Sequence, residues 1–169
     1  MKNKKLYKFV LSAAFAAIIF AATAYLPRIP IFGGAGGYVH VGDAFIYLAA
    51  SLLPLPFAPL AAAIGGALAD ALTGFMIWAP ATFIIKALMA LPFSSARQKI
   101  ITLRNAVAAT ASGLICIAGY YLYEAAVISN FTAALASIPF NAVQAVVSGA
   151  IYLVAGLALD RIKLKSRVN

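Results

Sequence analysis

Apolar residues form long runs along this chain, and polar residues interrupt the runs at a few places. The runs predict helices at about residues 6–26, 44–53, 58–72, 81–93, 106–126 and 139–159. The first and the last two are about 20 residues long, which is what a helix needs to cross the hydrocarbon core of a bilayer. The second to fourth are shorter, with prolines and glycines around them.

The composition places these helices in a membrane. The chain has 169 residues, of which 64% are hydrophobic and 10% charged, whereas a soluble domain carries about 25% charged residues. We therefore expect an all-α integral membrane protein, with residues 1–169 forming one compact bundle of six transmembrane helices. The first apolar run, of about 18 residues, exceeds the apolar region of a cleavable signal peptide, so we expect a retained helix.

The positive charges predict the orientation. The formal net charge is +9, and most Lys and Arg residues lie before residue 9, in the segment 94–105 and after residue 160. Basic segments of this kind mark the cytoplasmic side of a membrane protein rather than a nucleic-acid surface. Both termini are then cytoplasmic, and the loops 27–42, 74–80 and 127–138 are external.

Polar side chains of the apolar segments gather in the outer half of the predicted bundle. An ionisable group in a bilayer costs at least about 2.5–3.5 kcal/mol, so such groups are usually functional or paired. We predict a substrate-binding pocket for a small heteroaromatic molecule, covered by an external capping loop at 27–43 and formed by Tyr38, His40, Asp43, Asp70, Trp78, Lys86, Glu124, Asn141 and Gln144. Two alternatives stay open: internal ion pairs such as Lys86 with Asp70 or Glu124, and Asp43 as a helix N-cap.

The sequence offers little for catalysis or energy conversion. It has no GxxxxGK[ST] phosphate loop, no HExxH zinc motif and no nucleophile elbow. The single cysteine, Cys116, excludes an internal disulfide and a cysteine-cluster metal site. We expect no enzyme, no cofactor and no bound metal.

Small residues recur every four positions on the first helix, at Ala13, Ala17 and Ala21. Such a stripe lets another helix approach closely in lipid. The neighbour could belong to the same bundle or to a partner protein.

The chain resembles the S components of energy-coupling factor (ECF) vitamin transporters, and most closely the riboflavin-type or hydroxymethylpyrimidine-type subgroup. The resemblance covers nearly the whole chain and is carried by GGYVHVGDAFIYLAASLL, GGALADALTGFMIWAPATFIIKALM and PFNAVQ. It implies a multi-pass protein of a prokaryotic plasma membrane that binds one vitamin, a transmembrane coupling subunit and two cytoplasmic ATPases. It also implies that Ala13 and Ala17 contact the coupling subunit, and that the first external loop covers the substrate.

Other classes of protein fit the residues as well. A stand-alone oligomeric transporter or channel for a small polar solute would not depend on Ala13 and Ala17. A small membrane enzyme would use Asp43, His40 or Asp70 as an acid or base. A structural membrane subunit would hold only internal polar pairs.

Overall fold

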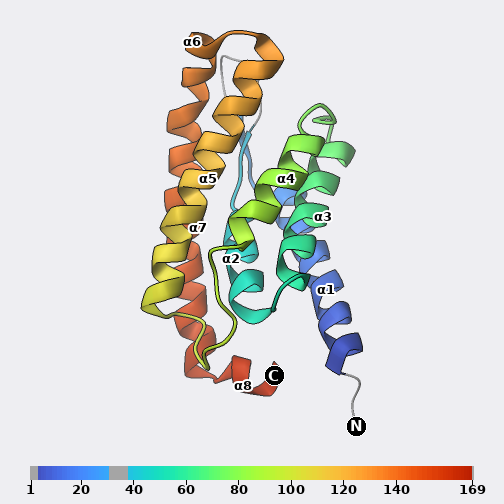
Figure 1. Cartoon of the computed structure of the whole chain (residues 1–169), viewed down its shortest axis with the longest axis vertical. Coiled ribbons are helices and arrows are strands. Elements are labelled where there is room, and N and C mark those ends of the chain that lie inside the picture. Colours follow the sequence, from blue (N-terminus) through green and yellow to red (C-terminus); the bar gives the residue numbers. More distant parts are fainter. Residues whose placement is uncertain (1–3, 31–37, 169) are drawn as a thin grey trace.

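The computed structural model describes residues 4–30 and 38–168 and is built mainly of helices (Figure 1). Two short strands, β1 and β2, pair antiparallel through Ile29 with Val39 and Pro30 with Tyr38. In chain order the elements are α1 (Lys4–Tyr25), β1 (Ile29–Pro30), β2 (Tyr38–Val39), α2 (Asp43–Leu52), α3 (Phe57–Leu72), α4 (Ala79–Ala90), α5 (Leu103–Ile128), α6 (Phe131–Ala134), the 3-10 helix η1 (Leu135–Ser137), α7 (Ile138–Arg161) and α8 (Leu164–Val168).

Local sequence signals explain where several helices begin. Thr102 precedes α5 and accepts a hydrogen bond from the backbone N–H of Asn105 at 3.2 Å, as an N-cap residue does. Pro80 and Pro139 lie in the first turns of α4 and α7, where a missing N–H costs nothing. The six main helices end within three residues of the boundaries expected from the sequence. The loop expected at 127–138 contains α6 and η1, and the basic tail contains α8.

Three stretches of the described chain are helical, long and apolar enough to cross a membrane: Lys4–Tyr25, Leu103–Ile128 and Phe131–Arg161. The other main helices have 10, 16 and 12 residues. At 1.5 Å per residue, the shortest of them reaches about 15 Å, half of the hydrocarbon core. The fold is thus that of an all-α membrane protein, while the count of six complete spans stays a prediction.

Helix α2 is the centre of the packing. Nine of its ten residues are buried, and it contacts α1, α3, α4 and α7. Around it Tyr47 stacks on Phe93 with ring centroids 5.2 Å apart, and Tyr152 meets both rings edge-on. A helix that is apolar all round belongs inside a bundle, and this explains how a ten-residue helix is held in the membrane domain.

Helices α1 and α3 approach closely at Gly65. A Cβ atom at this position would lie 2.6 Å from the carbonyl oxygen of Ala16 and 2.9 Å from Cβ of Ile19, so only glycine fits. Small residues give helices this contact in lipid, where packing rather than hydrophobicity drives association. The stripe of Ala13 and Ala17 is exposed and is not buried by this contact.

The start of α1, the segment 91–102 and α8 lie at one end of the molecule, which we call the basic end; α6 and the α3–α4 turn lie at the other (Figure 1). At the basic end the carboxylate of Asp160 accepts hydrogen bonds from the backbone N–H groups of Ile100 and Ile101 at 2.7 and 2.9 Å. The buried Lys165 donates from Nζ to the carbonyl oxygen of Ser51 at 2.6 Å. These bonds tie the chain's last helices to the centre of the fold.

Candidate functional site

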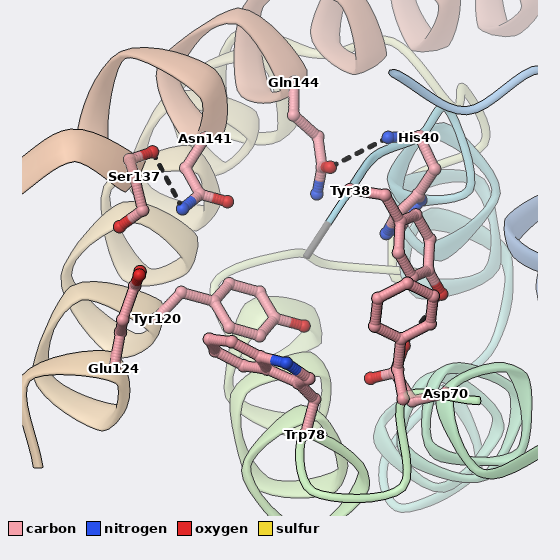
Figure 2. Close-up of a pocket in the computed structure, with 10 residues that line it drawn as sticks. Tyr38, His40, Asp70, Trp78, Tyr120, Glu124, Ser137, Asn141 and Gln144 are labelled. Atoms are coloured by element: carbon pink, nitrogen blue, oxygen red, sulfur yellow. Dashed lines mark hydrogen bonds between the residues drawn. The ribbon is translucent and has the colours of Figure 1, made fainter. Parts of the chain in front are cut away.

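A pocket lies at the end of the molecule opposite the basic end, where α5 finishes and α7 begins (Figure 2). Its empty space, including the opening to solvent, is about 430 Å³. Strand β2 and the α3–α4 turn complete the walls. The lining residues are Tyr38, His40, Asp70, Phe75, Trp78, Tyr120, Glu124, Ser137, Asn141 and Gln144.

Aromatic rings form two walls of this pocket. On one side Trp78 meets Tyr120, with ring centroids 6.1 Å apart. On the other side Tyr38 lies 4.6 Å from Phe75 and 5.6 Å from His40, centroid to centroid. Flat apolar faces of this kind suit a ligand with an aromatic ring.

Asp70, near the end of α3, links the two walls. Its Oδ1 accepts a hydrogen bond from Tyr38 Oη at 2.8 Å, and its Oδ2 accepts one from Thr82 Oγ1 at 2.5 Å. Thr82 Oγ1 also lies 2.9 Å from Tyr120 Oη. Burial and the neighbouring Asp70 carboxylate raise the pKa of Tyr38, so its hydroxyl stays protonated and keeps donating.

The amides of α7 enter the pocket from one helix face, because Asn141 and Gln144 are three residues apart. Gln144 Oε1 accepts from the backbone N–H of His40 at 3.0 Å and fixes the segment after β2. Asn141 Nδ2 donates to the carbonyl oxygen of Ser137 at 3.1 Å. Its Oδ1 points into the pocket (Figure 2), where no described residue is its partner.

His40 is held as a neutral ring. The backbone N–H of Gly42 donates to Nδ1 at 3.0 Å, so the proton of the neutral imidazole is on Nε2. Burial lowers the pKa of His40 to about 4, helped by the positive charges of Lys86 and Arg28 and opposed by Asp43. The turn needs glycine at 42, because a Cβ there would lie 2.1 Å from Oγ1 of Thr23.

Lys86 and Asp43 form a buried ion pair outside the pocket lining. Lys86 Nζ lies 2.6 Å from Asp43 Oδ1, and the side chains are 1% and 0% exposed. Gln144 Nε2 donates to Asp43 Oδ2 at 2.8 Å, and Lys86 Nζ lies 5.1 Å from the centroid of the Tyr120 ring. The N-cap of α2 is Gly42, and the Asp43 side chain bonds Lys86 and Gln144 instead of a capping N–H.

The structure brings seven of the nine candidate residues together around the pocket, and places Asp43 and Lys86 behind them. The lone lysine of the apolar segments pairs with Asp43, not with Asp70 or Glu124 as we considered from the sequence. The sequence analysis missed Phe75, Tyr120 and Ser137 as lining residues. A signal for the last two was available, because they precede Glu124 and Asn141 by four residues and so share their helix faces or turns.

No group of His, Cys, Asp and Glu side chains in the described residues could hold a metal ion. Cys116 is buried, and its Sγ lies 3.8 Å from Asp43 Oδ2 and from Lys86 Nζ. It therefore packs against the ion pair as a free thiol.

An aromatic and amide pocket near one end of a helical membrane protein is a candidate site for a small molecule. Residues 3–161 match the family model described as ECF-type riboflavin transporter, S component. The chain belongs to this family, and the resemblance found in the sequence is confirmed. It is a substrate-binding component of a vitamin-type transporter. No curated protein matches the chain.

Proposed function

We propose that this protein is the membrane-embedded, high-affinity substrate-binding subunit of an ECF-type ABC importer. Its substrate is a vitamin or a related heteroaromatic micronutrient, such as hydroxymethylpyrimidine, a pyridoxine-like vitamer or a flavin. The observation that carries the proposal is the pocket of aromatic and amide side chains in a chain of this family. Separate ATPases drive release of the substrate through a transmembrane coupling subunit.

The pocket geometry supports a ring as ligand. A heteroaromatic ring would lie against Trp78 and Tyr120, with Tyr38 and Phe75 closing the other side. Asn141 Oδ1 would accept a hydrogen bond from an edge of the ring (Figure 2). Tyr38 and His40 belong to the proposed capping loop 27–43, whose residues 31–37 lie outside the described part.

The charge distribution supports cytoplasmic termini. The described segments that contain these basic residues are the start of α1, the segment 94–105 and the chain after residue 160, and they lie toward the basic end (Figure 1). Basic segments favour the cytoplasmic side. The basic end would then face the ATPases, and the pocket would open outside.

The exposed stripe of α1 supports docking to the coupling subunit. Ser12 and Ile19 are buried on the inner face of α1, whereas Ala13 and Ala17 are exposed. Of the two neighbours that the sequence left open, a partner helix fits this outward placement better. Small side chains would let that helix approach closely.

Native mass spectrometry after mild purification tests the proposal. We expect a discrete added mass of a heteroaromatic compound on the wild-type protein, and its loss in Trp78→Ala and Asn141→Ala. Val154→Ala is the control, because this side chain of α7 is 71% exposed. If no compound is retained, even after incubation with a vitamin mixture, the proposed function is wrong.

Uptake assays distinguish an importer that needs a coupling subunit and ATPases from a stand-alone transporter. Cells that express this chain with a coupling subunit and ATPases should accumulate the retained compound. Cells that express the chain alone should not. Equal uptake in both would favour the stand-alone transporter.

A further inference from the structure

A second cavity lies toward the basic end, away from the substrate pocket. It opens between the α2–α3 connection, the end of α4 and the start of α5 (Figure 1). Its empty space, including the opening to solvent, is about 750 Å³. The lining has a buried apolar floor, which includes Leu53, Ala58 and Phe93, and a more exposed polar rim of Ser94, Ser95 and Arg104.

The rim lies at the level where phospholipid headgroups are expected. Arg104 is in the first turn of α5, a helix of 26 residues that is apolar enough to cross a membrane. At 1.5 Å per residue this helix reaches about 39 Å, which exceeds the hydrocarbon core of about 30 Å, so its ends reach the headgroup region. Leu103 and Val107 flank Arg104 on α5 and are 84% and 61% exposed. Acyl chains can therefore lie directly beside the rim.

The rim is also positively charged. Arg104 is exposed, and among the described residues no carboxylate lies within ion-pair distance of it. The chain has four acidic residues, and the one near this end, Asp160, accepts hydrogen bonds from two backbone N–H groups. Arg97 and Lys99 add two exposed cations to the same segment. The cavity thus combines a cationic rim, hydroxyl groups and an apolar floor.

We propose that this cavity binds an anionic phospholipid. The lipid phosphate accepts hydrogen bonds from the guanidinium of Arg104, whose planar fork matches phosphate oxygens. The serine hydroxyls of the rim are further donors, and the acyl chains lie against Leu103 and Val107. Basic pockets between transmembrane helices on the cytoplasmic side are a recognised form of lipid site. The proposal goes beyond the proposed function and does not depend on the identity of the substrate.

Native mass spectrometry of retained lipids tests the proposal on the full chain. The protein is reconstituted in nanodiscs with equal amounts of phosphatidylglycerol and phosphatidylcholine that carry the same acyl chains, and is then released into mild detergent. We expect phosphatidylglycerol to be retained at least about fivefold over phosphatidylcholine, the factor that one surface Lys or Arg contributes to binding of anionic lipid. Equal retention of the two lipids would overturn the proposal.

Variants of the rim show whether the retained lipid occupies this cavity. Arg104→Gln should abolish most of the preference, and Arg104→Lys should keep most of it, because a lysine also binds phosphate. Ser95→Phe should reduce retention without changing any charge, because the larger side chain fills the cavity. Arg161→Gln is the matched control, since Arg161 is exposed at the end of α7 and is not part of the lining. Thermal unfolding followed by circular dichroism shows that each variant is folded.

Three results would contradict the lipid site and leave the proposed function unaffected. Equal losses in Arg104→Gln and Arg161→Gln would show a diffuse attraction to the basic end. Unchanged retention in Ser95→Phe would place the lipid outside the cavity. If Arg104→Gln and Ser95→Phe instead weaken co-purification with the coupling subunit and leave lipid retention unchanged, the cavity binds a partner protein.

Discussion

Lys86 and Asp43 connect the middle of α4 to the first residue of α2 through a 2.6 Å ion pair. Removing two charges from water is costly, and their attraction repays this cost only when the remaining polar atoms are also satisfied. Here Asp43 Oδ2 accepts from Gln144 Nε2, and Gln144 Oε1 in turn accepts from the backbone of His40. The pair therefore connects α2 and α4 behind the pocket and positions Gln144, an amide of the pocket lining.

Replacing one partner of this ion pair should destabilise the fold more than replacing both partners. Lys86→Met leaves a buried carboxylate without its cation and should lower the free energy of unfolding by about 3–5 kcal/mol. The double variant Lys86→Met with Asp43→Asn should lose much less, because no charge is left buried. Denaturant unfolding in detergent, followed by Trp78 fluorescence, measures both. If the double variant loses at least as much stability as Lys86→Met, the two side chains are not a coupled pair.

His40 predicts a pH dependence of stability. Its pKa is about 4 in the folded protein and about 6.5 when unfolded, because burial disfavours the imidazolium. Between these values the unfolded chain binds a proton that the folded chain does not, so stability falls as the pH falls from about 6.5 to 4. The stabilisation from the neutral His40 is fully present above about pH 6.5, and its loss amounts to on the order of 3 kcal/mol.

His40→Asn is the matched variant, because an Asn oxygen can accept from the Gly42 N–H two residues on. Unfolding measured from pH 7.5 to 5 should show a steeper decline for the wild type than for the variant. Carboxylates titrate in both proteins and cancel in the comparison. If the stability of the wild type and of the variant falls equally with pH, His40 is not buried as a neutral ring.

The sequence predicted much of the site at this scale, because charges and amides in apolar runs are conspicuous. It did not show which polar groups pair with each other. Asp43 and Lys86 are 43 residues apart, and several acids in the outer half were equally plausible partners for the lysine. Phe75 carried no such mark, because aromatic residues are common at membrane interfaces. Tyr120 was marked only by its place one helical turn before Glu124.

At the scale of elements, the helices were the most predictable part. The long apolar runs predicted the boundaries of the six main helices to within three residues. The α6–η1 segment was missed because seven residues are too few for a periodic pattern. How a ten-residue helix such as α2 fits a membrane domain depends on its neighbours, which sequence periodicity does not reveal.

Helix α1 has two faces with different roles in the proposal. The inner face packs closely on Gly65 of α3 through Ala16 and Ile19, and the outer face carries Ala13 and Ala17. A change on the outer face should therefore spare the fold and the pocket.

Larger side chains at Ala13 and Ala17 should disrupt assembly with the coupling subunit and should leave substrate binding unchanged. We expect the double variant Ala13→Leu with Ala17→Leu to reduce co-purification with the coupling subunit at least about tenfold, because the partner helix loses its close approach. Substrate retention should be unchanged. Ala118→Leu is the control, since Ala118 is also exposed but lies on α5, away from α1 in the bundle (Figure 1). Unimpaired assembly of the double variant would place the docking surface elsewhere.

At the scale of the whole molecule, the two ends differ in charge and in chemistry. Apart from Arg28 and Lys86, every Lys and Arg lies in the terminal segments or between residues 94 and 105. The pocket lies at the other end, with acidic and aromatic side chains. We expect this polarity to orient the chain in a membrane, because basic segments favour the cytoplasmic side.

Cysteine labelling in intact cells tests this orientation. Cys116 is fully buried, so the wild type should react little with a membrane-impermeant maleimide. Phe131→Cys, at an exposed site of α6, should be labelled in intact cells, whereas Arg97→Cys should be labelled only after permeabilisation. The reverse pattern would place the pocket in the cytoplasm, where it could not take up a substrate from outside. Labelling of both sites in intact cells would show that the two ends do not lie on opposite sides of the membrane. The substrate could then not pass from an external pocket to ATPases at the opposite end, as proposed.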